Sequence, residues 1–236
     1  MSDLPPLVLV TGGTSSIVRT TIRDNSRICE VHTALSHAEI PKRRLSSVEF
    51  ETAGLLDDAG WDAAMEGVDC VLFFTSPLLS PVRCRKTKKK SKSLLLLCNA
   101  VQGTKRVLRA AGDAGVKRVV VTKPALVSAY PKSKTLAERA AWEVLEEATG
   151  EESDSQMELV AINPVNVYGP ILDPEGSTTL RSVGELLDDT VPGIPRINWG
   201  VVDVRDVADL HVLAMTHPDA PRNRFICIGE GTLMGE

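Results

Sequence analysis

The chain has 236 residues, 43% hydrophobic and 25% charged, which is the composition of a globular protein with a sizeable core. A formal net charge of −4 and an aromatic content of 4% argue against a general nucleic-acid or anionic-membrane binder. The longest purely aliphatic run, residues 94–97, is far shorter than the ~20 residues that cross a bilayer, and the N-terminus lacks the charged region of a signal peptide. We therefore expect a cytoplasmic protein without a membrane partner.

Short apolar or β-branched runs predict six strands, and apolar residues at helical spacing between them predict three helices. The strands are expected at residues 7–10, 18–22, 68–74, 116–122, 159–162 and 224–228, and the helices at 94–114, 132–149 and 204–215. Gly115 and Gly150 follow the first two helices, as is typical of a helix C-terminus. This alternation predicts an α/β fold, a Rossmann-type doubly wound parallel sheet covered on both faces.

One connection in this pattern is too short for that fold. Only residues 12–17 separate the first expected strand from the second. A parallel crossover needs a dozen or more residues, normally with a helix. We therefore predict that the first βαβ crossover helix is missing.

The cysteines and histidines indicate no metal or disulfide site, and the basic residues form one local run. The five cysteines and four histidines are scattered, without a C-x-x-C pair, so neither a metal site nor a disulfide framework is predicted. Residues 83–92 contain seven basic residues but no aromatic ones. We interpret this run as a solvated surface loop; the alternative is a targeting or polyanion-binding segment.

Several stretches, in the same order over most of the chain, resemble the extended short-chain dehydrogenase/reductases of the NAD-dependent epimerase/dehydratase group. The similarity is to the dihydroflavonol-4-reductase and cinnamoyl-CoA-reductase-like branch. The most specific stretches are S-A-Y-P-K-S-K-T-L-A-E at 128–138, N-P-V-N-V-Y-G-P at 163–170 and V-V-D-V-R-D-V-A at 201–208. Internal and C-terminal pieces of the family pattern are missing.

The resemblance implies one Rossmann-type domain over residues 1–236. Residues 171–200 and 229–236 correspond to a partial substrate-binding lobe. An incomplete lobe would leave apolar surface uncovered, which favours self-association.

The resemblance also implies NADP(H) as the cofactor, with NAD(H) as the alternative. Glycines after the first strand let the backbone approach a pyrophosphate, and Arg23 matches the family's arginine that pairs with the ribose 2′-phosphate. The chain departs from the family pattern at Ser15 and Val18, where glycines are expected, and at Gly54, where an Asp contacts adenine. The implied cofactor-binding residues are Thr11, Gly12, Gly13, Arg23, Thr75, Lys134, Asn163 and Pro164.

Tyr130 and Lys134 form a Y-x-x-x-K motif, whose spacing puts both side chains on one face of a helix. A free tyrosine has a pKa of about 10, and a cation one turn away stabilises its phenolate. The resemblance implies that Tyr130 protonates the carbonyl oxygen as hydride arrives and that Lys134 also holds the nicotinamide ribose. The family's catalytic serine is absent; Thr122 is the nearest hydroxyl to its place, and Ser128 is a second, local candidate.

The reading that these residues favour is an NADP(H)-dependent oxidoreductase that reduces a small-molecule ketone or aldehyde by hydride transfer. One alternative is a catalytically inactive family member that acts as a binding protein. Another is a sugar-nucleotide epimerase or dehydratase, which the stretches at 19–24 and 201–208 disfavour. Asp203, Arg205 and Asp206 resemble an ion cluster that caps the next helix, and we expect them to be structural rather than catalytic.

Overall fold

The computed structural model describes residues 7–11, 51, 53–55, 58–74, 89–123, 129–149, 156–170, 178–188, 198–229 and 231–233. At 89–97, 129–134, 178–182, 198–199 and 231–233 it describes the backbone alone. The expected strand at 18–22 and the short connection before it lie outside the described residues, so the predicted loss of the first crossover helix stays a prediction.

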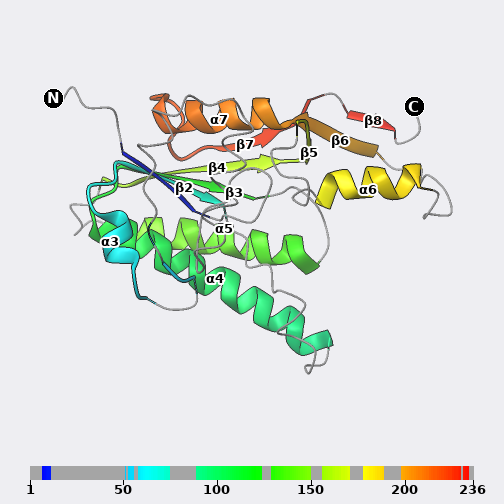
Figure 1. Ribbon diagram of the computed structural model, residues 1–236. Helices are drawn as coiled ribbons and strands as arrows, with labels where there is room; N and C mark the ends of the chain where they lie inside the picture. The colour runs from blue at the N-terminus through cyan, green and yellow to red at the C-terminus, as the bar shows by residue number, and fades with distance from the viewer. Residues whose placement is uncertain are drawn as a thin grey trace.

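A parallel sheet forms the centre of the molecule (Figure 1). Its strands are β1 (Val8–Thr11), β2 (Cys70–Phe74), β3 (Arg118–Thr122), β4 (Glu158–Pro164) and β7 (Arg224–Cys227), in the order β1-β2-β3-β4-β7. Every neighbouring pair is parallel. Five of the six expected strands are therefore present close to their predicted bounds, and the predicted α/β fold with a parallel sheet is confirmed.

Helices cover both faces of this sheet. Helices α3 (Trp61–Met65), α4 (Lys89–Asp113) and α5 (Ala129–Ala148) lie on one side, and α7 (Val204–Thr216) lies on the other (Figure 1). Helix α4 ends as predicted, because Gly115 adopts a left-handed φ of 73° that a residue with a side chain rarely takes. It begins earlier than predicted: residues 89–92 of the basic run belong to its first turn rather than to a loop. Helix α5 also begins earlier, at Ala129, since a proline such as Pro131 is tolerated in a first turn.

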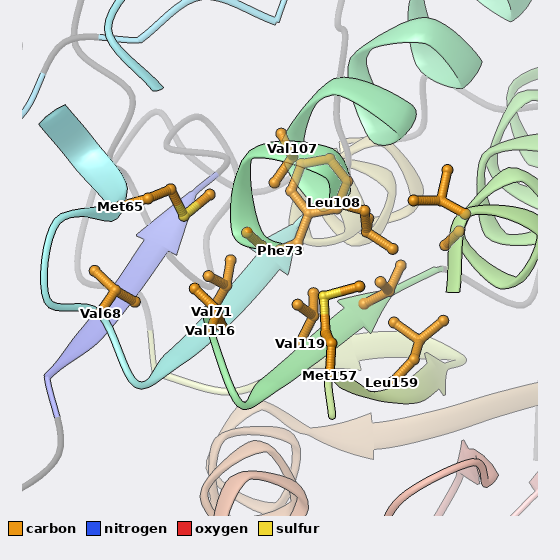
Figure 2. Packing of buried hydrophobic residues seen from close by; sticks show 14 of the residues in the cluster. Met65, Val68, Val71, Phe73, Val107, Leu108, Val116, Val119, Met157 and Leu159 are labelled. Atoms are coloured by element: carbon orange, nitrogen blue, oxygen red, sulfur yellow. The ribbon is translucent and has the colours of Figure 1, made fainter. Parts of the chain in front are cut away.

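Two hydrophobic clusters hold the layers together. The larger one joins α3, α4 and α5 to the sheet through residues such as Phe73, Leu108 and Leu159, all at most 1% exposed (Figure 2). The smaller one joins α7 to the opposite face. Along β3, Val119 and Val121 belong to the first cluster and Val120 to the second. Because both faces are buried, the strand reads as a continuous apolar run, and burying each such side chain contributes about 1.5–3 kcal/mol.

A smaller sheet adjoins the carboxyl end of β4. Strand β5 (Asn166–Tyr168) pairs in parallel with β6 (Asn198–Asp203), which pairs antiparallel with β8 (Gly231–Leu233). Helix α6 (Thr178–Leu187) contacts β5. These elements were not predicted individually: β5 and β8 have only three residues each, and α6 and the first half of β6 lie inside the expected partial lobe. The boundary of that lobe stays a prediction. Among the described helices, none is long and apolar enough to cross a membrane.

Candidate functional site

The predicted site residues gather at the carboxyl edge of the parallel sheet wherever the structure describes them. Thr11 is the last residue of β1, Thr122 is the last residue of β3, and Asn163 and Pro164 end β4. The register brings these ends level, with Thr11 beside Phe73. Ligands of open parallel sheets bind at this edge. Four further predicted residues lie outside the described residues: Gly12, Gly13, Arg23 and Thr75.

Tyr130 and Lys134 lie in the first two turns of α5. The helix returns the chain from the carboxyl end of β3 to the start of β4, so its first turns are those nearest the carboxyl edge. The predicted helical spacing of four residues is confirmed, and it places both positions on one face of α5. Their roles in catalysis stay a prediction.

Asn163 lies on the face of the sheet that α5 covers. Side chains alternate along β4, and Leu159, four residues earlier, belongs to the cluster under α4 and α5. The Asn163 side chain is buried, and its Oδ1 has no hydrogen-bond partner among the described residues. The same holds for Thr11 Oγ1, two residues after Leu9, which packs against that cluster. Buried polar atoms are normally satisfied, so these two oxygens, which have no partner among the described residues, mark two points of the carboxyl edge, at β1 and β4, that fit polar groups of a ligand.

Thr122 faces the opposite layer. Its Oγ1 lies 2.7 Å from Nε2 of His211, a buried residue of α7 that stacks on Phe74 with ring centroids 5.0 Å apart. His211 Nδ1 lies 2.6 Å from the Val207 carbonyl oxygen and must donate to it. In the neutral imidazole Nε2 is then the acceptor, so Thr122 donates its hydroxyl proton to His211. Burial lowers the pKa of His211, against a smaller opposing effect of the Val207 hydrogen bond.

His211 is therefore a hydrogen-bonded core histidine. The Thr122 hydroxyl is engaged with it rather than turned toward α5. The catalytic role of Thr122 stays a prediction, and Ser128 lies outside the described residues.

A cluster of charged side chains, which was not predicted from the sequence, joins α5 to the sheet. Glu138 is only 2% exposed, and its carboxylate accepts hydrogen bonds from Arg224 Nε at 2.6 Å and Nη2 at 3.2 Å. Lys123 Nζ lies 3.3 Å from the same carboxylate. We call Lys123, Glu138 and Arg224 the Glu138 cluster. The sequence carried one signal for this cluster: Glu138 comes four residues after Lys134 and therefore lies on the same helix face.

Asp203 and Arg205 form the helix cap that the sequence predicted. Asp203 is the N-cap of α7 and accepts hydrogen bonds from the Arg205 backbone N–H at 2.8 Å and from its guanidinium at 2.8 and 2.6 Å. These bonds, the guanidinium's first, lower the pKa of Asp203 to about 2. An ionised oxygen at a helix N-terminus also satisfies a backbone donor that would otherwise lack a partner.

Comparisons with known proteins agree with the parallel α/β fold described above. Residues 121–229 match the model of the NAD dependent epimerase/dehydratase family. The chain is 30% identical to tetraketide alpha-pyrone reductase 2 of Arabidopsis thaliana over 93% of its length and 76% of that protein. It is 28% identical to cinnamoyl-CoA reductase CAD2 of Medicago truncatula, over 93% of its length and 75% of that protein.

A solved structure with the same fold is that of a yeast methylglyoxal/isovaleraldehyde reductase complexed with NADPH. It superposes with a TM-score of 0.69 at 24% identity, covering 96% of this chain and 79% of the yeast chain. Three observations indicate the same family: the parallel sheet, the Y-x-x-x-K helix at its carboxyl edge and the sequence similarity along most of the chain. The chain belongs to the NAD-dependent epimerase/dehydratase family of extended short-chain dehydrogenase/reductases, and the relatives it matches are reductases.

Proposed function

We propose that this protein is an NADP(H)-dependent reductase of a small-molecule ketone or aldehyde. The observation that supports this most strongly is the position of α5, which brings Tyr130 and Lys134 to the carboxyl edge on the face where buried Asn163 Oδ1 has no described partner. The relatives support the same chemistry, because their names describe reductases of carbonyl compounds. The finer assignment, a dihydroflavonol-reductase-like substrate, rests on the sequence resemblance.

The described residues fit a dinucleotide at this edge. Thr11 Oγ1 and Asn163 Oδ1 are buried at the ends of β1 and β4 and have no hydrogen-bond partner within the part of the chain that the structure describes; a cofactor's hydroxyl or amide groups would satisfy them there. Gly12 and Gly13 would let the backbone approach the pyrophosphate, and Arg23 would pair with a 2′-phosphate, which favours NADP(H) over NAD(H). Thr75 and Pro164 would line the same edge. When bound, the cofactor supplies the hydride.

The protein's own residues then handle the proton. Tyr130 donates it to the carbonyl oxygen, and the Lys134 ammonium, one turn along α5, stabilises the phenolate that remains. Each pKa unit by which a phenol is shifted corresponds to about 1.4 kcal/mol. Thr122 is the third group we assign, as a hydroxyl donor to the carbonyl oxygen. Because its hydroxyl points to His211 on the α7 face of the sheet, this role requires the end of β3 to rotate as well as the release of that hydrogen bond.

Two further assignments follow from composition and surface. We place the protein in the cytoplasm, with no nucleic-acid partner. Self-association is supported by apolar side chains that remain exposed outside the two clusters, among them Ile226 of β7 at 70% and Leu187 of α6 at 79%.

A thermal-shift titration with NADPH, and separately with NADH, tests the cofactor. A ligand at about 100 times its Kd stabilises a folded protein by roughly 2.7 kcal/mol, which raises the Tm of a chain of this size by several degrees. We expect a shift with NADPH and a smaller one with NADH. If neither nucleotide shifts a cooperative melt, the cofactor assignment is wrong and the inactive binding protein is the better reading.

Turnover tests the chemistry. NADPH oxidation is followed by its absorbance with methylglyoxal, a ketoaldehyde that tests the proposed substrate class directly, and with cinnamoyl-CoA, a thioester that relatives' names suggest. Tyr130→Phe should reduce turnover by at least about 10²-fold while the NADPH-induced shift remains, because only the proton donor is lost. Turnover that survives this substitution would show that Tyr130 is not the donor.

A further inference from the structure

The Glu138 cluster contains a carboxylate in a place where charge is costly. Glu138 is 2% exposed, and both of its oxygens are taken up by Arg224 and Lys123. A buried charge persists only when it is paired and hydrogen-bonded. The cluster is therefore a fixed attachment point of α5, not a chance surface contact.

The partners of Glu138 come from two separate strands. Lys123 directly follows β3, and its backbone N–H donates to the Ile162 carbonyl at 2.8 Å, which continues the ladder to β4. Its side chain is 14% exposed and reaches α5, whereas Thr122 before it faces α7. Arg224 is the first residue of β7 and lies level with Ala161 of β4. Glu138 thus ties α5 to the strands on either side of β4.

The buried residues of α5 close to Glu138 are small, whereas the larger ones, Val144 and Leu145, pack in the core cluster farther along the helix. The buried residues next to Glu138 are Ala137, Ala140 and Ala141, each at most 2% exposed. Alanines allow a close approach to the sheet but interlock weakly, so a small rotation or slide of α5 meets little steric resistance there. The two hydrogen bonds from Arg224 resist such movements, because bond strength falls steeply with misalignment, and the Lys123 ion pair ties the same carboxylate to a second strand.

The helix transmits this attachment to the candidate site. Lys134 lies one turn before Glu138, and Tyr130 lies two turns before it. The eight residues from Tyr130 to Glu138 correspond to about 12 Å along the helix axis. All three positions lie on one face. Any displacement of Glu138 would carry Tyr130 and Lys134 with it, relative to the ends of β3 and β4.

We propose that Lys123 is a positioning residue, which through Glu138 holds Tyr130 and Lys134 in register with the carboxyl edge of the sheet. This rests on the proposed function. Lys123 touches neither substrate nor cofactor in this proposal. A misplacement of reacting groups by about 1 Å can cost about 10²-fold in rate, so a loosened attachment should lower turnover without unfolding the chain.

The test compares Lys123→Met, Lys123→Arg and Lys105→Met with the parent protein. Lys105 is the matched control, because its ion pair with Glu143, at 2.9 Å, also joins α5 to a neighbouring element but not to the sheet. The measurements are kcat with methylglyoxal or cinnamoyl-CoA per NADPH-binding molecule, the Kd of NADPH, and the Tm.

For Lys123→Met we expect kcat to fall by at least about tenfold, whereas Lys105→Met should stay within about twofold of the parent. Lys123→Arg keeps a cation within reach of Glu138 and should recover most of the lost kcat. A merely structural role predicts a different result: Lys123→Met would lower the Tm but leave kcat per NADPH-binding molecule unchanged. That result would overturn the proposal, as would a failure of Lys123→Arg to rescue.

Hydrogen exchange separates this proposal from the proposed function. If the parent neither binds NADPH nor reduces a carbonyl, the proposed function fails, but exchange of the α5 amides at 130–138 still reports on the attachment. Faster exchange there in Lys123→Met, and not in Lys105→Met, would support the positioning role. Equal exchange in the two variants would contradict it.

Discussion

Arg118 connects the sheet to the far end of α7, and its removal is the stability change that can be worked out most fully. It is the first residue of β3, with a side chain 13% exposed. Its Nη1 donates to the carbonyl oxygens of Ala214 at 3.2 Å, Met215 at 2.9 Å and His217 at 2.9 Å. Its Nε and Nη2 lie 2.7 and 2.6 Å from Glu158 Oε2. The last carbonyls of a helix lack intrahelical donors, and Arg118 supplies them.

Replacing Arg118 by Met removes these bonds but keeps much of the apolar stem. A hydrogen bond to a charged group contributes about 1.5–3 kcal/mol. The three carbonyls share one donor atom near the surface, so we count them as one such bond, about 2–3 kcal/mol. The Glu158 pair adds less than about 1 kcal/mol, because that carboxylate is 40% exposed. The sum is about 3 kcal/mol, which lowers the Tm by roughly 6–12 °C.

Urea and thermal unfolding followed by circular dichroism would measure this loss. The m-value should not change, since the same surface is exposed on unfolding. Glu158→Gln is the control and should cost less than about 1 kcal/mol. If Arg118→Met costs no more than Glu158→Gln, the capping of α7 contributes nothing measurable and the reasoning is refuted.

Three further predictions concern β5, β3 and α7. Gly169→Ala should destabilise by at least about 2 kcal/mol in urea unfolding, because φ is 137° and a Cβ would lie 2.7 Å from Val204 Cγ1; a neutral result would show that this turn yields easily. Thr122→Val should cost about 1–3 kcal/mol, since it leaves buried His211 Nε2 without its donor, and Thr122→Ser should restore most of this; equal losses in both would contradict it. The lowered pKa of His211 means that the unfolded chain takes up a proton first, so His211 contributes stability above its ordinary pKa of 6.5 that is lost as pH falls toward the folded value. His211→Phe should flatten this part of the pH–stability curve, and an unchanged slope would assign it to other groups.

The sequence predicted those features that depend on a few neighbouring residues. The apolar runs of β2, β3 and β4 identify strands buried on both faces, and Gly115 ends α4 because only a glycine readily adopts its φ. The spacing of Tyr130 and Lys134 needs nothing but helical periodicity. The Asp203 cap was likewise predicted from its motif, since its partner Arg205 is two residues away.

Contacts between distant residues could not be predicted in this way. Thr122 meets His211 across 89 positions of sequence, and Glu138 meets Arg224 across 86. The strand pattern is the same whichever helix covers a given face, so it does not say that Thr122 turns toward α7 while Asn163 turns toward α5. It also does not show that Glu138 is buried, because a glutamate on a helix normally faces water.

By itself, then, the sequence determined that this chain builds a parallel α/β sheet and carries the Y-x-x-x-K helix of its family, because hydrophobic periodicity and motif spacing act over a few residues. Only the tertiary structure decided which polar groups at the carboxyl edge are hydrogen-bonded and which have no partner among the described residues. The physical reason is that burial and pairing depend on the layer that packs against each face. The α7 layer brings His211 onto Thr122, and the α5 layer brings Glu138 onto Lys123 and leaves Asn163 Oδ1 without a described partner.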